Sequence, residues 1–295
     1  MRRRVAHLSC GLLAAAALLA ALAHAAQGLP LDPLATDEPA TLPPPQMLEM
    51  TIPSHGAQLY GVFYQAGAAG AHATLLLLHG FAGFEQNEDL AQAARRAGFN
   101  VLIFHYRGSW GSTGTFSFAH CIEDTEAVLG HLRNHAQQLA VDPRHMVLAG
   151  HSVGGQVAGV VAARDPQISG LALISAANRR LAMARPGWAA ETRARFQGEL
   201  GPLRGTTAGI LVSELESHAR QWDLVSLAPQ WRGRAVLVVS CDDRFRDEDD
   251  AVAAAAEPAH LTAVHLNTDH AYSGQRVALT RALLAWLEGT TRPAP

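Results

Sequence analysis

The sequence contains no lysine, so each of its 23 fixed positive charges is an arginine. The glycine-rich turn at residues 150–155 therefore lacks the lysine that a nucleotide-binding P-loop requires. Against the arginines stand 26 acidic residues, which gives a net charge of −3. Removal of the arginines at positions 2–4 with the leader described below leaves 20 arginines and a charge of −6. A mildly acidic chain without a basic tract argues against nucleic-acid binding, and we expect no nucleic-acid partner.

Cysteine is scarce, with three residues at positions 10, 121 and 241. Cys10 precedes the first apolar run and does not follow it, which argues against a lipoprotein attachment site. An oxidising compartment would permit a disulfide between Cys121 and Cys241, and the sequence does not show whether the two residues meet. Two buried free thiols are the preferred interpretation, because unpaired cysteine behaves as a small apolar residue.

Long apolar runs are absent after the first 25 residues. Arg2–Arg4 form a basic segment, Leu12–Leu22 an apolar one, and Ala23-His24-Ala25 fits a signal-peptidase site. The apolar run is short for a membrane-spanning helix, which needs about 20 residues. We therefore predict a cleaved signal peptide over residues 1–25 and export to the periplasm or the medium, with an uncleaved anchor as the alternative. No stable membrane span is expected in the mature chain.

The rest of the chain is predicted to be a linker, one large domain and a short tail. Residues 26–45 contain six prolines and no hydrophobic periodicity, as expected for a linker. From residue 46 to residue 289, strand-like apolar runs alternate with helix-like segments, and residues 290–295 form the tail. The alternation predicts βαβ units and an α/β fold with a mainly parallel sheet. Strands are expected at 46–53, 58–65, 73–78, 100–105, 146–149, 170–175, 235–240 and 261–266, and helices at 87–97, 119–137, 156–164 and 275–287.

Residues 178–230 interrupt this alternation. The segment is polar, rich in arginine and helix-prone, and it lies between two expected strands. We interpret it as a helical cap inserted into the domain, where it would set substrate specificity. Its scattered tryptophans are expected either to line a substrate pocket or to form the cap's own core.

The strongest chemical signal is the segment Gly150-His151-Ser152-Val153-Gly154. An apolar run at 146–149 precedes it and a helix-compatible segment at 156–164 follows it. This is the strand–turn–helix context of a nucleophile elbow, in which a sharp turn exposes a serine hydroxyl. Gly150 and Gly154 are expected because side chains there would collide as strand and helix close together. Ser152 is therefore the candidate nucleophile.

A serine hydroxyl is a weak nucleophile and needs a base, which an acid must orient. The expected strand at 235–240 ends just before Asp242 and Asp243, and the last expected strand ends shortly before His270. The order Ser, Asp, His along the chain is the order associated with this elbow. His270 is the candidate base and Asp243 the preferred acid, with Asp242 left open. The acidic residues that follow, 247–250, are interpreted as a solvated turn.

An oxyanion hole requires two backbone N–H donors aimed at one point. We expect one from Val153, immediately after the candidate nucleophile. The other is expected from Phe81, in the loop after the strand at 73–78, where Gly80 allows the backbone to approach closely. His79 is interpreted as a structural residue that supports this loop.

Together these segments resemble the α/β-hydrolase superfamily, in particular its serine aminopeptidase-like and acyl-esterase-like branches. The resemblance covers residues 46–289 in family order, and it implies the α/β-hydrolase fold, a Ser-His-Asp triad and no cofactor. Many relatives carry an Asp before the Arg-Gly pair, whereas this chain has Tyr106, so no role of that Asp is carried over. The matching segments are 78–81, 106–114, 150–154, 242–244 and 269–270.

We therefore expect an exported serine hydrolase that cleaves a carboxylic ester through an acyl-enzyme. The alternative is a serine peptidase with the same triad, and a further one is a non-catalytic binding protein of the same fold. The expected partner is a small ester or short peptide, and the oligomeric state is left open. The histidines at 131 and 135 are interpreted as a solvated helix face, so no metal site is expected. A peptidase that acts on free N-termini would need a carboxylate for the ammonium group, for which the cap offers Glu191, Glu199, Glu214 and Glu216.

Overall fold

The computed structural model describes residues 32–290, so the predicted signal peptide and most of the predicted tail lie outside the described residues. Residues 32–38 belong to a separate N-terminal unit, and the fold described here is that of the unit beginning at Pro39. Within residues 32–290, no helix combines the length and the apolar character needed to cross a bilayer.

Eight strands form one mixed sheet in the order β1-β2-β4-β3-β5-β6-β7-β8. β2 runs antiparallel to β1 and β4, and the remaining neighbours are parallel. The predicted α/β fold class with a mainly parallel sheet is therefore confirmed. The strands are β1 (Gln46–Ser54), β2 (Ala57–Gln65), β3 (His72–Leu78), β4 (Asn100–Phe104), β5 (Val141–His151), β6 (Ile168–Ile174), β7 (Ala235–Cys241) and β8 (Leu261–Leu266).

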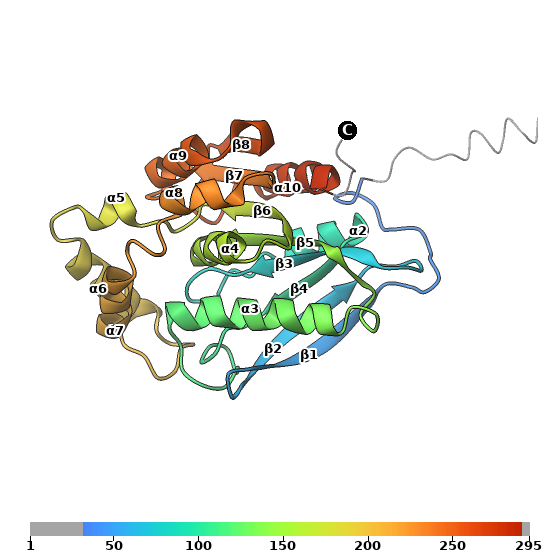
Figure 1. Ribbon diagram of the computed structural model, residues 1–295, viewed down its shortest axis with the longest axis horizontal. Coiled ribbons are helices and arrows are strands. Elements are labelled where there is room, and N and C mark those ends of the chain that lie inside the picture. Colours follow the sequence, from blue (N-terminus) through green and yellow to red (C-terminus); the bar gives the residue numbers. More distant parts are fainter. Residues whose placement is uncertain (1–31, 291–295) are drawn as a thin grey trace, which may run out of the picture. The chain divides into compact units, whose positions relative to one another are not determined.

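Helices cover both faces of this sheet (Figure 1). α3 packs beside α4 on one face, and α2 packs beside α10 on the other. The flanking helices are α2 (Glu88–Arg96), α3 (Phe118–Asn134), α4 (Val153–Arg164), α9 (Arg246–Ala255) and α10 (Arg276–Thr290), and a 3-10 turn, η2 (Pro258–His260), leads into β8.

The centre of the sheet is buried on both sides, which explains its uninterrupted apolar strands. All five residues of β4 are buried, and so is β3 from Thr74 to Leu78. α4 is buried from Val153 to Ala162, because it packs against the sheet, α3 and α8. Since β5, β7 and β8 are parallel, their carboxyl ends meet along one edge of the sheet, where α/β proteins bind ligands.

The segment between β6 and β7 contains α5 (Arg180–Met183), α6 (Trp188–Glu199), α7 (Ala208–Ser217), α8 (Leu224–Leu227) and η1 (Ala228–Trp231). In Figure 1, α6 and α7 lie beyond the end of the sheet and α8 lies against the body. The segment's three tryptophans, Trp188, Trp222 and Trp231, are all buried. The Trp231 indole donates a hydrogen bond to the Gly159 carbonyl of α4 at 3.0 Å, so this residue serves packing.

The acidic run at 247–250 is not a solvated turn, so that interpretation is wrong. It begins α9, and Glu248 and Asp249 are buried. Glu248 Oε1 accepts hydrogen bonds from the amides of Leu181 and Ala182 at 2.6 and 3.1 Å. Asp249 Oδ1 accepts one from the Ala176 amide at 3.0 Å. Both carboxyl groups are buried because each accepts hydrogen bonds from backbone amides that would otherwise lack partners.

Candidate active site

Ser152 occupies the sharp turn between β5 and α4, with φ 57° and ψ −119°. A positive φ is strained for a residue with a Cβ, and such strain is typical of functional turns. A Cβ on Gly150 would lie 2.1 Å from the Gly154 carbonyl oxygen, and one on Gly154 would lie 2.2 Å from the Leu78 carbonyl oxygen. The two glycines are therefore required by the closeness of the backbone, as the sequence predicts.

His270 and Asp243 lie in contact at the same edge of the sheet. His270 Nδ1 is 2.5 Å from Asp243 Oδ2, and the Phe245 amide donates to the other carboxylate oxygen at 2.7 Å. Burial raises the pKa of Asp243, but the hydrogen bond from His270 and that from the Phe245 amide outweigh it, so the pKa lies below its usual value. The carboxylate is thus held ionised beside the imidazole.

Asp242, the other candidate acid, points elsewhere. Its carboxylate is half exposed and pairs with Arg246 at 2.7 Å and with His265 at 3.3 Å. The structure therefore brings Asp243 and not Asp242 to His270.

His151, which the sequence analysis assigned no role, joins the His270 loop to the elbow. Its Nε2 is 2.8 Å from the His270 carbonyl oxygen, and the two rings are 4.6 Å apart between centroids. Burial and the neighbouring His270 lower the pKa of His151 to about 3, so the ring is neutral at physiological pH. A neutral ring with its proton on Nε2 donates this hydrogen bond. Because His151 directly precedes Ser152, the bond attaches the backbone of His270 to the elbow that carries the serine.

No hydrogen bond joins Ser152 to His270 among residues 32–290. Catalytic hydrogen bonds of this kind are often long in the free enzyme and tighten when substrate binds. The Ser152 side chain instead faces the loop after β3, where its Oγ lies 3.6 Å from the position of a Cβ added to Gly80.

Val153 directly follows this serine, and Phe81 follows Gly80, which lies against the serine side chain. Within the described part of the chain, the amides of Phe81 and Val153 donate no hydrogen bond, so both are available to an incoming oxygen. A Cβ on Gly80 would lie 3.0 Å from the Ser152 Cβ, which explains glycine there. His79 Nδ1 lies 2.8 Å from the Gly80 carbonyl, and burial lowers the His79 pKa to about 4. A neutral, buried His79 fits a structural role in this loop.

Residues 69–247 match the family model described as Serine aminopeptidase, S33. The chain belongs to this family. Uncharacterized protein YfhR of Escherichia coli (strain K12) is 35% identical over 104 residues, which are 34% of this chain and 36% of that protein. The YfhR protein of Salmonella typhimurium is 32% identical over a segment of the same length, 34% of this chain and 35% of that protein. The alignments thus span about a third of these curated relatives.

Several solved esterases share the fold of this S33 family member. EstE1, a carboxylesterase cloned from a metagenomic library, superposes with a TM-score of 0.63 at 21% identity, over 88% of this chain and 92% of its own. Est1E from Butyrivibrio proteoclasticus, with ferulic acid bound, gives 0.65 at 17% identity, over 82% and 98%. Brefeldin A esterase, a bacterial protein, gives 0.63 at 18% identity, over 89% and 79%. The resemblance to α/β-hydrolases is therefore confirmed.

A buried hydroxyl and thiol network supports the base loop from behind. The Ser175 hydroxyl lies 2.9 Å from the Tyr272 hydroxyl and 3.0 Å from the Cys241 thiol. Tyr272 also donates to the Val239 carbonyl at 2.9 Å. The network therefore ties the loop after β8, which carries His270, to the end of β7. The sequence offers no pattern that marks these residues.

Cys241, Asp243 and His270 present ligand atoms within 4.8 Å of one another, a set that a metal ion can use. Within the described residues, however, Asp243 and His270 are hydrogen-bonded to each other, and the Cys241 thiol is hydrogen-bonded to Ser175. Cys241 and Cys121 are both buried and unpaired, as preferred from the sequence. The cluster therefore fits an acid–base pair backed by a neutral thiol better than a metal centre.

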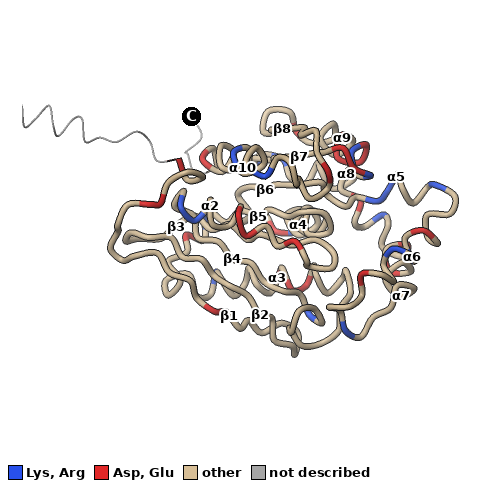
Figure 2. The backbone as a smooth tube through the Cα atoms, turned by 180° about the vertical axis from the view of Figure 1, so that it is seen from behind, with Lys and Arg blue, Asp and Glu red and all other residues tan. Residues whose placement is uncertain are grey.

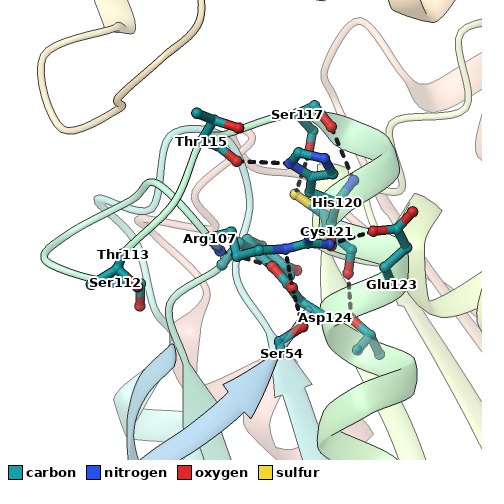
Figure 3. Close-up of polar contacts among 12 residues, drawn as sticks. Ser54, Arg107, Ser112, Thr113, Thr115, Ser117, His120, Cys121, Glu123 and Asp124 are labelled. Atoms are coloured by element: carbon teal, nitrogen blue, oxygen red, sulfur yellow. Dashed lines mark hydrogen bonds and ion pairs between the residues drawn. The ribbon is translucent and has the colours of Figure 1, made fainter. Parts of the chain in front are cut away.

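The Arg107-Gly108 segment is held by a buried ion pair between Arg107 and Asp124 (Figure 3). The Arg107 side chain and amide both donate to the Asp124 carboxylate, at 2.6 and 2.8 Å. Ser54 at the end of β1 donates to the same carboxylate at 2.6 Å. Further along the segment, the Trp110 indole donates to the Ala82 carbonyl at 2.7 Å. The segment therefore braces the loop that carries Phe81.

Proposed function

We propose that this S33 family hydrolase is a serine esterase that works through an acyl-enzyme. The family and the fold identify a hydrolase, and the serine mechanism and ester preference are our proposal. The observation that carries it is the Asp243–His270 hydrogen bond in a loop fixed against the elbow by His151. An oriented, ionised carboxylate behind an imidazole is the arrangement that makes a serine hydroxyl nucleophilic.

In the first half-reaction, Ser152 Oγ bonds to the ester carbonyl carbon while His270 Nε2 takes the hydroxyl proton. The amides of Phe81 and Val153 bind the developing oxyanion. When the tetrahedral intermediate collapses, the C–O bond to the alcohol breaks and His270 returns the proton to the alcohol. Asp243 holds His270 in the productive tautomer and stabilises its charged form.

In the second half-reaction, water attacks the acyl-enzyme and gives its proton to His270. Collapse of the second intermediate releases the carboxylic acid, and Ser152 recovers its proton. The cycle consumes one ester and one water, and it yields one acid and one alcohol, with every proton step at His270.

The direct test is turnover of 4-nitrophenyl butyrate by Ser152→Ala. We expect kcat to fall by about three to six orders of magnitude, because the covalent step is lost. Thermal unfolding should show that the variant folds. Unchanged turnover by a folded S152A protein would eliminate Ser152 as the nucleophile.

An aminopeptidase is the second candidate, favoured by the description of the family itself. Such an enzyme needs a free carboxylate for the substrate ammonium group. Both oxygens of Glu214 are occupied, because they accept hydrogen bonds from the amides of Phe118 and Ala119 at 2.9 Å each. Glu191 is exposed beside Arg185 at 3.9 Å. A preference for aminoacyl-anilides over short nitrophenyl esters would support the peptidase and overturn the esterase.

The predicted signal peptide adds the proposal that the enzyme acts outside the cytoplasm. Fractionation of cells that express the full sequence, followed by intact mass measurement, tests this. The expected product starts near residue 26 and is found in the periplasm or medium. A full-length product retained in the cytoplasm would contradict export.

A further inference from the structure

Three arginines gather where the segment between β6 and β7 meets the body. Arg179 follows β6, Arg195 is on α6, and Arg244 is in the turn between β7 and α9. Figure 2 shows basic residues along α5, α6 and the segment leading into α9. The three charges are close enough to repel one another. Within residues 32–290, none of the three forms an ion pair with a carboxylate.

Arg179 is the unusual member, because its side chain is buried, with 4% of the residue exposed. One guanidinium nitrogen donates to the Gln156 side chain at 3.1 Å and to the Ala177 carbonyl at 3.0 Å, both neutral groups. Its Nε atom is buried without a hydrogen-bond partner in the described chain. A buried charge is costly unless an opposite charge compensates it, and no carboxylate of the described residues bonds to the Arg179 guanidinium.

The charges around Arg179 also favour an anion at this position. Burial, followed by repulsion from Arg195 and Arg244, lowers the pKa of Arg179 to about 9. Glu248 and Glu199 act in the opposite direction without overcoming this effect. The local field is therefore positive, and an anion placed there would be attracted.

Aromatic rings hold the guanidinium groups in place. The Arg179 guanidinium carbon lies 5.7 Å from the Phe118 ring centre and 5.8 Å from that of Phe245. The Arg244 guanidinium lies over the same Phe245 ring at 4.6 Å. The Arg195 guanidinium lies over Phe196 at 5.3 Å. Stacking on rings orients a guanidinium while leaving its N–H edge free for a ligand.

The same rings border the proposed reaction centre. Phe245 lies 5.5 Å from the His270 ring, and Phe196 lies 4.6 Å from the ring of Phe81, whose amide is a proposed oxyanion donor. Ala177 connects Arg179 to the serine. Its carbonyl accepts the hydrogen bond from Arg179, and its amide donates to the Ser152 carbonyl at 2.8 Å. The cationic cluster therefore lies beside the proposed nucleophile and base.

We propose that Arg179, Arg195 and Arg244 form an anion subsite that selects ester substrates carrying a carboxylate. The proposal rests on the proposed esterase function, and it names the substrate class of that site. Arg244 is exposed and Arg195 half-buried, so these two contact the carboxylate, while Arg179 supplies a buried charge beneath them. A guanidinium binds a carboxylate through paired, charge-assisted hydrogen bonds. The same field repels the ammonium group of an aminopeptidase substrate.

The test compares anionic and neutral esters of matched shape. One pair places the charge on the acyl side, mono-4-nitrophenyl glutarate against 4-nitrophenyl hexanoate. A second pair places it on the leaving group, 4-acetoxyphenylacetate against its amide. We expect the wild-type kcat/KM to be at least about tenfold higher for the anionic member of one pair, the size of one charge-assisted hydrogen bond. The pair that shows the preference locates the carboxylate.

Arg195→Gln and Arg244→Gln should each lower this anionic-to-neutral ratio of kcat/KM by about tenfold. Arg193→Gln is the matched control, because Arg193 is exposed on the same helix as Arg195 and its loss changes the net charge equally. The control should keep the ratio. Arg179→Lys retains the charge and is used in place of a neutral variant, which risks misfolding. It should keep part of the preference.

Two results would overturn the proposed anion subsite while leaving the proposed esterase function intact. One is equal turnover of both members in both pairs, in an enzyme that still cleaves neutral esters and loses activity in Ser152→Ala. The other is an equal loss of preference in Arg193→Gln, which would show a general charge effect. Failure of the wild type to cleave any of the esters would instead defeat the proposed function, and the subsite with it.

Discussion

At the scale of single residues, two adjacent carboxylates have different surroundings. Asp243 is mostly buried and receives hydrogen bonds from His270 and the Phe245 amide, whereas Asp242 is half exposed and pairs with Arg246 and His265. The turn after β7 directs one inward and the other to solvent. Chain position alone leaves both open, because they differ by one residue in a turn whose direction the sequence does not specify.

This difference gives a matched pair of variants. We expect Asp243→Asn to lower kcat on a nitrophenyl ester by about 10³- to 10⁴-fold, because the amide no longer enforces the productive tautomer of His270. Asp242→Asn should stay within about twofold, since a half-exposed ion pair contributes little. Steady-state kinetics on both proteins measures this. Equal losses in the two variants would contradict the assignment of the acid.

Asp249 is a buried acid that the sequence analysis placed in a solvated turn. Burial, followed by repulsion from Asp243, raises its pKa well above the ordinary value. Above pH of about 4 the unfolded chain releases this proton while the folded chain retains it, so the free energy of unfolding falls as pH rises. We expect Asp249→Asn to be more stable than wild type near pH 8, with the difference shrinking towards pH 5.

Urea unfolding at the two pH values measures this effect. Asp250→Asn, at the exposed neighbouring position on α9, is the control and should change stability by less than about 0.5 kcal/mol. A pH-independent difference between Asp249→Asn and wild type would show that the carboxyl is not the cause.

At the scale of elements, hydrophobic patterning predicted the eight strands of the sheet and the helices α2, α3, α4 and α10 to within a few residues, apart from an early start of β5. Fully buried strands such as β4 are easy to recognise, because both faces are apolar. α9 was missed because its first turn is acidic, a composition that suggests solvent. Its buried carboxyl groups accept hydrogen bonds from backbone amides of another segment, which no local pattern reveals.

A second contact between distant elements concerns Glu214 of α7, whose carboxylate accepts from the first two amides of α3. A carboxylate at a helix N-terminus satisfies orphan donors and interacts favourably with the helix dipole. We expect Glu214→Ala to lower the free energy of unfolding by about 1–3 kcal/mol. Glu216→Ala, on the exposed face of the same helix, should have little effect. Similar losses in both would contradict the capping role, and thermal or urea unfolding decides.

At the scale of the whole molecule, the two cysteines lie in separate parts of the core, and both are unpaired. Burial raises the pKa of each thiol, so neither is reactive in the folded protein. We expect protein prepared without residues 1–25, which retains two of the three cysteines, to react with a thiol reagent such as DTNB only after unfolding, and then to release two equivalents. Absence of reaction after unfolding without reductant would indicate a disulfide and contradict the structure.

The sequence was sufficient to predict the sheet and to predict that Ser152, Asp243 and His270 follow its strands, because parallel strands bring their carboxyl ends to one edge of the sheet. It did not predict which side chains surround these three residues. His151, Tyr272 and the arginine cluster depend on how loops from β5, β6, β7 and β8 pack against one another. The proposed anion subsite therefore lies in the part of the molecule that hydrophobic patterning describes least.

The central claim is that Ser152 is a nucleophile activated by His270 and Asp243, and covalent labelling tests it most directly. The protein is treated with a neutral alkyl fluorophosphonate, digested, and the adduct is located by peptide mass spectrometry. We predict one phosphonyl group on Ser152, formed more slowly in Asp243→Asn and absent from Ser152→Ala. No adduct on the wild-type protein, or an equal adduct on Ser152→Ala, would contradict the account.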